Sequence, residues 1–318
     1  MPGEGRPEPV SHLAAVLRAG HFAVAAELSP PRGVNLEDIR RQAAILKDYT
    51  DAVNVTDNQA ASVRMASIPV CGLLVQAGVE PVAQMTCRDR NRLAIQADLL
   101  GAAALGVRNV LCLNGDHGKW GDHPAAKNVY DIDSAQLIRM VRNMVEHGCL
   151  DNGKALKPSP QFLVGAVANP FAPPLAYRPM RLAKKIAAGA QFIQTQLIYN
   201  VERFRAYMTQ VTDLGLDRQV YILAGVGPLR SLRVAEHMAR NVAGMDVPQA
   251  ILERMAKTPK ERQAAEGIQI CLEIVEQVRT IPGLAGLHVM AIHWPEAVPE
   301  IVTRIGLYPR PLREVVAT

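Results

Sequence analysis

The side chain with the clearest capacity for acid–base chemistry is Glu27, which closes an apolar run and is followed by Pro30 and Pro31. The two prolines fix the backbone of the turn that follows, so the carboxyl group is expected to stay at the end of the run. A partly buried carboxyl group has a raised pKa, as a general acid requires near neutral pH. The alternative is structural, because a lone glutamate can also serve there as a cap or an ion-pair partner.

Other polar residues end other apolar runs, and each has a chemical and a structural interpretation. Asp116 follows Gly115 and either acts on a ligand or simply forms a turn. Gln194 and Gln196 have the same strand parity, so both amides are expected to point into the interior of a closed sheet. There they either bind a ligand or are core amides whose hydrogen bonds are satisfied within the protein. Thr56 ends a further run and is equally compatible with an ordinary strand position.

Metal and cluster chemistry is not expected. His117, Asp122 and His123 lie in one loop, but this loop is rich in glycine and lacks the spacing of a helical ligand pair. The sequence holds five cysteines, and none forms a Cys-x-x-Cys pair of the kind that binds zinc or an iron–sulfur cluster. We therefore predict no metal site and no disulfide framework.

The elements that must position these residues alternate between short apolar, β-rich runs and longer segments of helical period. The predicted strands are His21–Leu28, Asp51–Asp57, Glu80–Cys87, Asn109–Gly115, Gln161–Asn169, Phe192–Ile198, Val220–Val226 and Leu287–His293. The predicted helices are Leu36–Lys47, Ala60–Ala77, Arg90–Leu105, Ser134–His147, Pro179–Ala188, Val201–Leu214, Ser231–Asn241, a longer stretch over Pro248–Arg279, and Ala297–Ile305.

Eight alternating strands and helices predict an α/β protein with a (β/α)₈ TIM barrel in a single domain over residues 1–318. A doubly wound sheet is the alternative, although no Gly-x-Gly-x-x-Gly follows the first strand. Residues 1–12 are expected to form a peripheral or flexible segment. In a barrel the chemistry gathers at the carboxyl ends of the strands, where Glu27, Thr56, Asp116 and Gln196 would meet, beside the long loop Asn114–Asp133.

The amino-acid composition limits which kinds of molecule this protein is expected to bind. The net charge is +5, but the basic residues are scattered and only 4% of residues are aromatic, so nucleic acid is not an expected partner. An anionic small molecule is compatible with this charge. No apolar run reaches the length of roughly 20 residues that a membrane span needs, and the polar start of the chain does not resemble a signal peptide. A cytoplasmic location is therefore expected.

The strand-end residues, taken in order, resemble those of the methylenetetrahydrofolate reductase family, from about His21 to Pro309. The matching pieces are the Glu-x-x-Pro-Pro of residues 27–31, Val55-Thr56-Asp57, residues 86–91 (Thr-Cys-Arg-Asp-Arg-Asn), Gly115-Asp116, Ala188-Gly189-Ala190, Gln194-Thr195-Gln196 and Ala224-Gly225-Val226-Gly227-Pro228. Each piece is short, and it is their order and their places at strand ends that make the set specific.

The resemblance implies a flavoprotein oxidoreductase of one-carbon metabolism, in which a (β/α)₈ barrel reduces 5,10-methylenetetrahydrofolate to 5-methyltetrahydrofolate. By similarity, Glu27 is the acid that opens the five-membered ring of the substrate, and Asp116 acts beside both flavin and pterin. The resemblance further implies that the folate is bound by Gln194, Gln196 and Asp116, and the flavin by Thr56, Gln84, Asn114, Asp116, Ala166 and Lys185.

This chain departs from the family pattern at several positions. Gln84 stands where many relatives have histidine, Asn114 where arginine precedes Gly-Asp, Val167 where tyrosine is frequent, and Trp294 where an arginine is associated with folate. FAD is the cofactor that the resemblance implies, with FMN as the alternative. NADH is the implied electron donor; the alternative is a folate-reducing subunit fed by an iron–sulfur partner protein. An oligomer is also expected.

Two other classes of protein fit this sequence less well. A non-catalytic subunit on the same fold would not need Glu27, Asp116 and Gln196 together. A barrel enzyme for phosphorylated sugars would need a glycine-rich phosphate loop after the last strands. Gly225-Val226-Gly227 hints at such a loop, but Pro228 removes one of its N–H donors. The reductase interpretation is therefore preferred.

Overall fold

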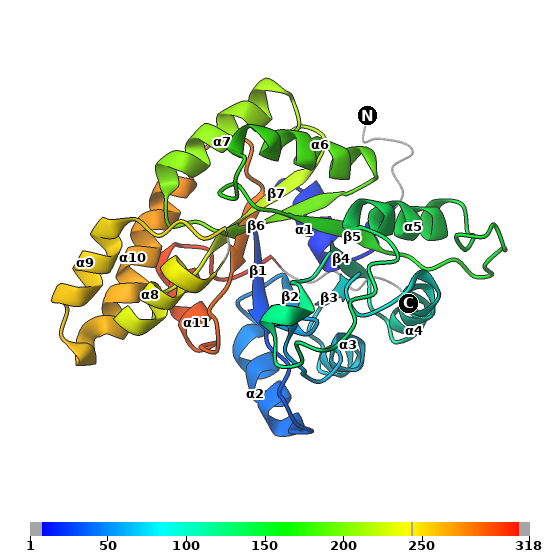
Figure 1. Cartoon of the computed structure of the whole chain (residues 1–318), viewed down its shortest axis with the longest axis horizontal. Coiled ribbons are helices and arrows are strands. Elements are labelled where there is room, and N and C mark those ends of the chain that lie inside the picture. The colour runs from blue at the N-terminus through cyan, green and yellow to red at the C-terminus, as the bar shows by residue number, and fades with distance from the viewer. Residues whose placement is uncertain (1–7, 243, 312–318) are drawn as a thin grey trace.

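The structure is a computed structural model that describes residues 8–242 and 244–311, and its eight strands form one closed parallel barrel surrounded by helices (Figure 1). The predicted (β/α)₈ fold is thus confirmed. Each strand pairs with the next along the chain, and β8 pairs with β1, which excludes the doubly wound sheet. The strands are β1 (Ala23–Leu28), β2 (Ala52–Val55), β3 (Pro81–Thr86), β4 (Asn109–Leu113), β5 (Leu163–Ala168), β6 (Phe192–Leu197), β7 (Tyr221–Val226) and β8 (Gly286–Val289).

Helices cover the outside of the barrel. They are α1 (His12–Arg18), α2 (Leu36–Leu46), α3 (Ser67–Gln76), α4 (Arg92–Ala104), α5 (Ser134–Glu146), α6 (Arg178–Ala187), α7 (Val201–Asp213), α8 (Leu232–Asn241), α9 (Gln249–Lys257), α10 (Gln263–Val278) and α11 (Ala297–Arg304). Short 3₁₀ turns lie at Gln59–Ala61 (η1), Gly118–Trp120 (η2), Leu175–Tyr177 (η3) and Lys260–Arg262 (η4). Within the described ranges, no helix combines the length and the apolar character that crossing a membrane demands.

Several elements differ from the predicted ones beyond small shifts at strand and helix ends. Helix α3 begins at Ser67 instead of Ala60, because Ala60 and Ala61 have φ angles of 54° and 52°, outside the right-handed helical region. The long stretch predicted over 248–279 is two helices, since α9 ends at the Thr258-Pro259 step. Strand β8 ends at Val289, so His293 lies beyond it in a turn. Helix α1 was not predicted at all.

Strand alternation divides the apolar side chains into two cores. On β1, Ala23 and Ala25 face the barrel interior, whereas Val24 and Ala26 face the surrounding helices. The inner core is made of Ala23, Ala25, Ala52, Val82, Leu111, Leu163, Phe192 and Leu223, together with Leu13, Ala14, Val16 and Leu17 of α1. Phe192 fits because its neighbour on β5 is Gly165, where a Cβ atom would lie 2.2 Å from the phenyl ring.

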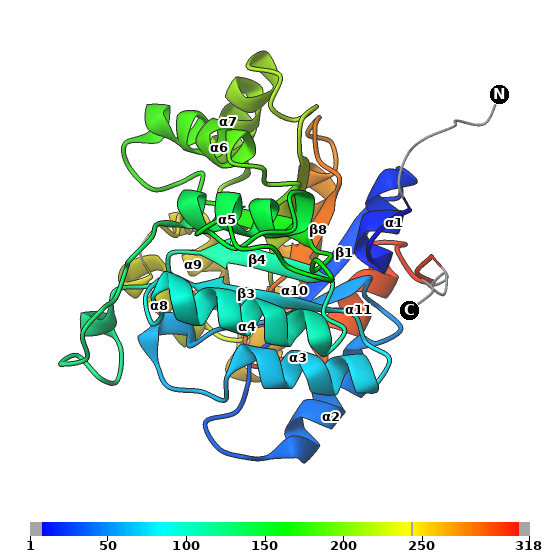
Figure 2. The ribbon, with the colours of Figure 1, turned by 90° about the vertical axis from the view of Figure 1, so that its right-hand side faces the viewer.

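Helix α1 closes the amino-terminal end of the barrel. The backbone N–H groups of His12 and Leu13 donate to the carboxylate of Glu80, at 2.7 and 2.8 Å, just before β3. Ser11 caps the helix and donates to Asn109 at the start of β4. Figure 2 shows α1 at one end of the strands, while the loop after β4 projects from the other end. Of the segment expected to be peripheral, residues 1–7 lie outside the described residues, and Ser11 and His12 are buried.

A buried ion pair ties the end of the described chain to this closed face. Arg310 donates to both carboxylate oxygens of Asp51, at 2.6 and 3.1 Å, and to the carbonyl oxygen of Phe22. His12 lies 3.6 Å from the same carboxylate. Burial alone would raise the pKa of Asp51, but the hydrogen bonds from His12 and Arg310 outweigh burial and lower it. The Asp51 carboxylate is therefore charged, buried and dependent on its partners.

Arg310→Met is expected to destabilise the fold strongly, because it leaves the charge of Asp51 buried without its main partner. The expected loss in free energy of unfolding is about 3–5 kcal/mol, measured by urea denaturation at pH 7. The matched control is Arg240→Met, which removes an exposed pair with Glu236 and should cost less than about 1 kcal/mol. Similar losses in the two variants would show that Asp51 does not need Arg310.

Candidate active site

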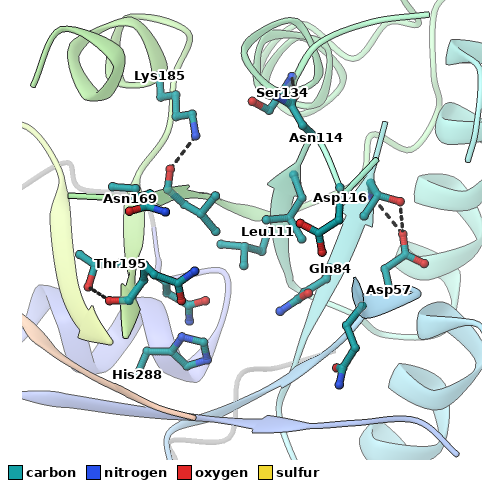
Figure 3. Close-up of a pocket in the computed structure, with 18 of the residues that line it drawn as sticks. Asp57, Gln84, Leu111, Asn114, Asp116, Ser134, Asn169, Lys185, Thr195 and His288 are labelled. Atoms are coloured by element: carbon teal, nitrogen blue, oxygen red, sulfur yellow. Dashed lines mark hydrogen bonds between the residues drawn. The ribbon is translucent and has the colours of Figure 1, made fainter. Parts of the chain in front are cut away.

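A cavity of about 470 Å³ opens at the carboxyl ends of the strands. Figure 3 shows it from within, with Lys185 and Thr195 on one side and Asp57, Gln84 and Asp116 on the other. Its lining residues come from the ends of β1 and β3–β6, from β8, from the loops that follow β2–β5, and from α5 and α6. They include Glu27, Asp57, Asn58, Gln84, Arg88, Leu111, Asn114, Asp116, Asn169, Arg178, Arg181, Lys185, Gln194, Thr195, Gln196 and His288.

Glu27 supplies an acidic group to this cavity. It shares the inward parity of Ala23 and Ala25, two residues beyond the inner core on β1. Among the described residues, no hydrogen-bond donor or cation is paired with its carboxyl group. Burial raises the pKa of Glu27 from 4.5 to about 7. Near neutral pH the carboxyl group is thus protonated in a large fraction of molecules and can give up a proton.

An amide pair spans the barrel, and one member, Gln194, lines the floor of the cavity. Asn54 on β2 donates to the Gln194 side chain at 2.5 Å, and Gln194 donates back to the Asn54 oxygen at 3.1 Å. Both residues are buried. Gln194 points inward, as its parity predicts. Its side-chain amide is already hydrogen-bonded to Asn54, so Gln194 is fixed in the floor of the cavity.

Gln196 is freer. Its side-chain oxygen accepts a hydrogen bond from the N–H of Leu197 at 2.9 Å, which leaves its NH₂ group to donate into the cavity. The pairing of β6 with β7 shifts register between Gln194 and Leu197, and this irregularity lets Thr195 line the cavity as well. Thr195 accepts a hydrogen bond from the N–H of Gly225 at 2.8 Å.

The turn after β4 brings an acidic side chain to the opposite wall. Asp116 lines the cavity with an exposed carboxylate, next to Gln84 of β3 (Figure 3). Asn114 accepts a hydrogen bond from the N–H of Ser134 at the start of α5, which fixes the turn to that helix. The cavity therefore carries a carboxyl group on each of two facing walls, Glu27 on β1 and Asp116 after β4.

Basic residues occupy one end of the cavity. Arg178, Arg181 and Lys185 are spaced three and four residues apart, on one face of α6, and all three line it. Lys185 donates to the carbonyl oxygen of Val167 at 2.6 Å, and burial lowers its pKa to about 8. Within residues 8–242 and 244–311, none of the three forms an ion pair with a carboxylate. Such a cluster is suited to bind an anion, phosphate in particular.

Two residues expected in the site do not line the cavity. Thr56 is buried at the end of β2, and its hydroxyl group has no hydrogen-bond partner among the described residues. Ala166 of β5 belongs to the outer core, so its methyl group faces the helices. The structure does bring together the other expected residues, namely Glu27, Gln84, Asn114, Asp116, Lys185, Gln194 and Gln196.

The cavity also contains side chains that the sequence interpretation did not assign to the site: Arg88, Arg178, Arg181 and His288. His288 lies on β8 at the level of Ala25 and is buried, and neither ring nitrogen has a partner in the described part of the chain. Burial lowers its pKa to about 3, so the ring is neutral at physiological pH. In the sequence, the position of His288 within the last predicted strand is the feature that could have indicated an inward-pointing side chain.

Comparisons with known proteins agree with this geometry. The chain matches the family model of methylenetetrahydrofolate reductase over residues 12–306. It is 22% identical over 298 residues to the 5,10-methylenetetrahydrofolate reductase of Pectobacterium carotovorum, with 91% of this chain and 92% of that protein covered. A Caenorhabditis elegans protein named probable methylenetetrahydrofolate reductase (NADPH) is 24% identical over 296 residues, but the chain spans only 42% of its length.

A solved structure shares the fold. A Clostridium thermocellum protein, described as binding two copies of 5-methyl-5,6,7,8-tetrahydrofolic acid, superposes with a TM-score of 0.63 at 11% identity, over 92% of this chain and 98% of that one. At this identity the likeness concerns the fold alone. The family model, by contrast, covers nearly the whole barrel, including every strand that contributes to the cavity. The chain belongs to the methylenetetrahydrofolate reductase family.

Proposed function

We propose that this chain reduces 5,10-methylenetetrahydrofolate to 5-methyltetrahydrofolate with the help of a bound flavin. The observation that carries the proposal is the carboxyl group of Glu27, which faces the cavity, has no ionic partner among the described residues and has a pKa raised to about 7. Opening the five-membered ring of the substrate requires a proton at the leaving nitrogen, and a neutral carboxyl group is suited to supply it. Family membership supports the choice of substrate.

The remaining polar side chains would orient the substrate. The free NH₂ group of Gln196 and the carboxylate of Asp116 lie on two walls of the same cavity, and a pterin ring offers them both acceptors and donors. Gln194 would support this contact from below, since Asn54 holds its amide in place. The neutral ring of His288 would complete the floor, with two nitrogens still able to form hydrogen bonds.

The residues present fit a flavin. A bound flavin would supply the hydride chemistry, and the protein would supply its position and electrostatics. Arg178, Arg181 and Lys185 would hold its phosphate, whereas Thr56, which does not line the cavity, is not part of this proposed contact. Gln84 and Asn114 line the same cavity, whereas the methyl group of Ala166 faces the surrounding helices.

FAD is the form of flavin that we propose. A second cavity, of about 510 Å³, adjoins the first through Asn114 and Gly115 and is lined by Tyr130, Ile132 and Gln136. This space would receive the adenosine half of FAD, with an aromatic ring and an amide at hand. FMN would leave it empty, so the mass of the flavin released from purified protein distinguishes the two.

NADH is the proposed electron donor. The test is anaerobic bleaching of the bound flavin by NADH, by NADPH and by dithionite. Bleaching by NADH with turnover by the isolated chain supports the proposal. Bleaching by dithionite alone would favour an iron–sulfur partner protein instead. The oligomeric state also stays a prediction, which light scattering of the purified protein would test.

Lys185→Met is expected to weaken flavin binding by about 10- to 100-fold, because it removes a partly buried cation from the end of the cavity that would hold the phosphate. The affinity is measured by quenching of flavin fluorescence as apoprotein is added. Lys184→Met is the matched control: Lys184 is the next residue of α6, but it pairs with Asp133 and does not line the cavity. Equal losses in the two variants would contradict the assignment.

Glu27→Gln is expected to keep the fold and the flavin but to slow the reduction of methylenetetrahydrofolate by at least about 10²-fold, because an amide cannot donate the proton. Reduction of the flavin by its electron donor needs no such proton and should continue nearly unchanged. Stopped-flow measurement of the two half-reactions separates these steps. Equal damage to both half-reactions would assign Glu27 a structural role only.

The same variant has an expected effect on stability that does not depend on turnover. The folded-state pKa of Glu27 is about 7 and its ordinary value is 4.5, so the folded chain holds an extra proton between these values. Wild-type stability therefore falls as pH rises from about 4.5 to 7, and the full cost of ionisation remains above pH 7. The Tm of Glu27→Gln relative to wild type should rise between pH 5 and pH 8. A difference that does not vary with pH would exclude a buried, titrating Glu27.

A further inference from the structure

The guanidinium group of Arg88 joins three loops at the mouth of the barrel. Arg88 follows β3 and is only 3% exposed. It donates to the carbonyl oxygen of Asn58 after β2 and to that of Asp116 after β4, both at 3.1 Å. Its own loop contributes Asp89, whose carboxylate accepts two hydrogen bonds from Arg88, at 2.6 and 2.7 Å. One side chain thus connects the ends of three neighbouring strands.

The backbone of the same residue holds the next loop, independently of the guanidinium group. The carbonyl oxygen of Arg88 accepts a hydrogen bond from Val129 at 2.7 Å, which brings the end of the long β4–α5 loop back over β3. Tyr130 donates from its hydroxyl group to the carbonyl oxygen of Gly115 at 3.1 Å. The 114–116 turn is therefore fixed from two sides, by Arg88 and by a loop that Arg88 anchors.

The fit between Arg88 and this turn is close. Gly115 has a φ of +84°, and a Cβ atom there would lie 3.1 Å from the Cβ of Arg88 and 3.2 Å from that of Thr86. A side chain at this position would push the turn away from Arg88. The positive φ and the crowding both favour glycine at this position. Because Gly115 has no side chain, the turn can lie against Arg88.

We infer that Arg88 is the positioning residue for Asp116, and that it sets where the Asp116 carboxylate meets the bound substrate. The inference rests on the proposed function, in which Asp116 contacts the pterin. Lysine cannot replace Arg88, because a single ammonium group cannot reach Asn58, Asp89 and Asp116 in the directions that the planar guanidinium group does.

A purely structural role is the alternative, and the chain offers a matched comparison. Arg310 is another buried guanidinium group that forks onto an aspartate, but it lies at the closed end of the barrel. Arg310→Lys should lower Tm and leave the folate half-reaction unchanged. Arg88→Lys should slow that half-reaction by about 10²-fold, as expected when a reacting group is displaced by about 1 Å.

The decisive experiment is a double-mutant cycle on the folate half-reaction, with Arg88→Lys, Asp116→Asn and the two combined. If Arg88 acts through Asp116, adding Arg88→Lys to Asp116→Asn changes the rate by no more than about 2-fold. Multiplying effects would overturn the inference. If Arg88→Lys fails to fold, Asp89→Asn takes its place, because it loosens the guanidinium group and keeps the arginine.

Hydrogen exchange provides a readout without turnover. Amide exchange over residues 114–130 should rise in Arg88→Lys and stay at the wild-type level in Arg310→Lys. Unchanged exchange in Arg88→Lys would overturn the inference even if the wild-type chain reduced methylenetetrahydrofolate. Conversely, a wild-type chain that fails to reduce this substrate would refute the proposed function, while the exchange measurement would still test whether Arg88 fixes the turn.

Discussion

A partly buried carboxyl group without a counter-ion is the constraint on which the mouth of this barrel depends. Glu27 keeps its raised pKa only while cations stay away from it, since a guanidinium group within a few ångströms would lower that pKa again. None of the cations that line the cavity is paired with Glu27 among the described residues. Arg88 is bound to the carboxylate of Asp89, and Arg178, Arg181 and Lys185 of α6 lie together at one end of the cavity. The barrel thus separates positive charge from the acid.

The same separation explains why the floor is made of neutral groups. Asn54 and Gln194 satisfy each other, and the ring of His288 is uncharged because burial lowers its pKa to about 3. Neutral side chains beneath the cavity keep it polar without adding a charge that would shift Glu27. Below them, the inner core and α1 exclude water from the amino-terminal end. The packed lower half of the barrel is therefore part of the environment that sets the proton affinity of the acid.

Much of this architecture could be predicted from the sequence because it depends on local patterns. Apolar runs marked all eight strands, strand parity predicted that Gln194 and Gln196 point inward, and Glu27 was singled out by its place at the end of the first run, before two prolines. What the sequence could not supply were contacts between distant residues. Gln194 meets Asn54 from 140 positions away, and the role of Arg88 appears only when three loops converge. Helix α1 was missed although Ser11 is a helix cap and Leu13, Val16 and Leu17 have helical spacing, because the sequence does not show that Glu80 and the barrel interior would bury so short a segment.

The closed face has a practical consequence for handling the molecule. Helix α1, at the start of the described chain, seals the amino-terminal end of the barrel, and Arg310, next to the last described residue, is anchored there by Asp51. Both described ends therefore lie at the amino-terminal side of the strands, where Figure 2 shows α1, whereas the cavity opens at their carboxyl ends. Tethering copies to a solid support through either end would orient each of them with its opening toward the solution, so immobilisation would not obstruct diffusion of small molecules into the barrel.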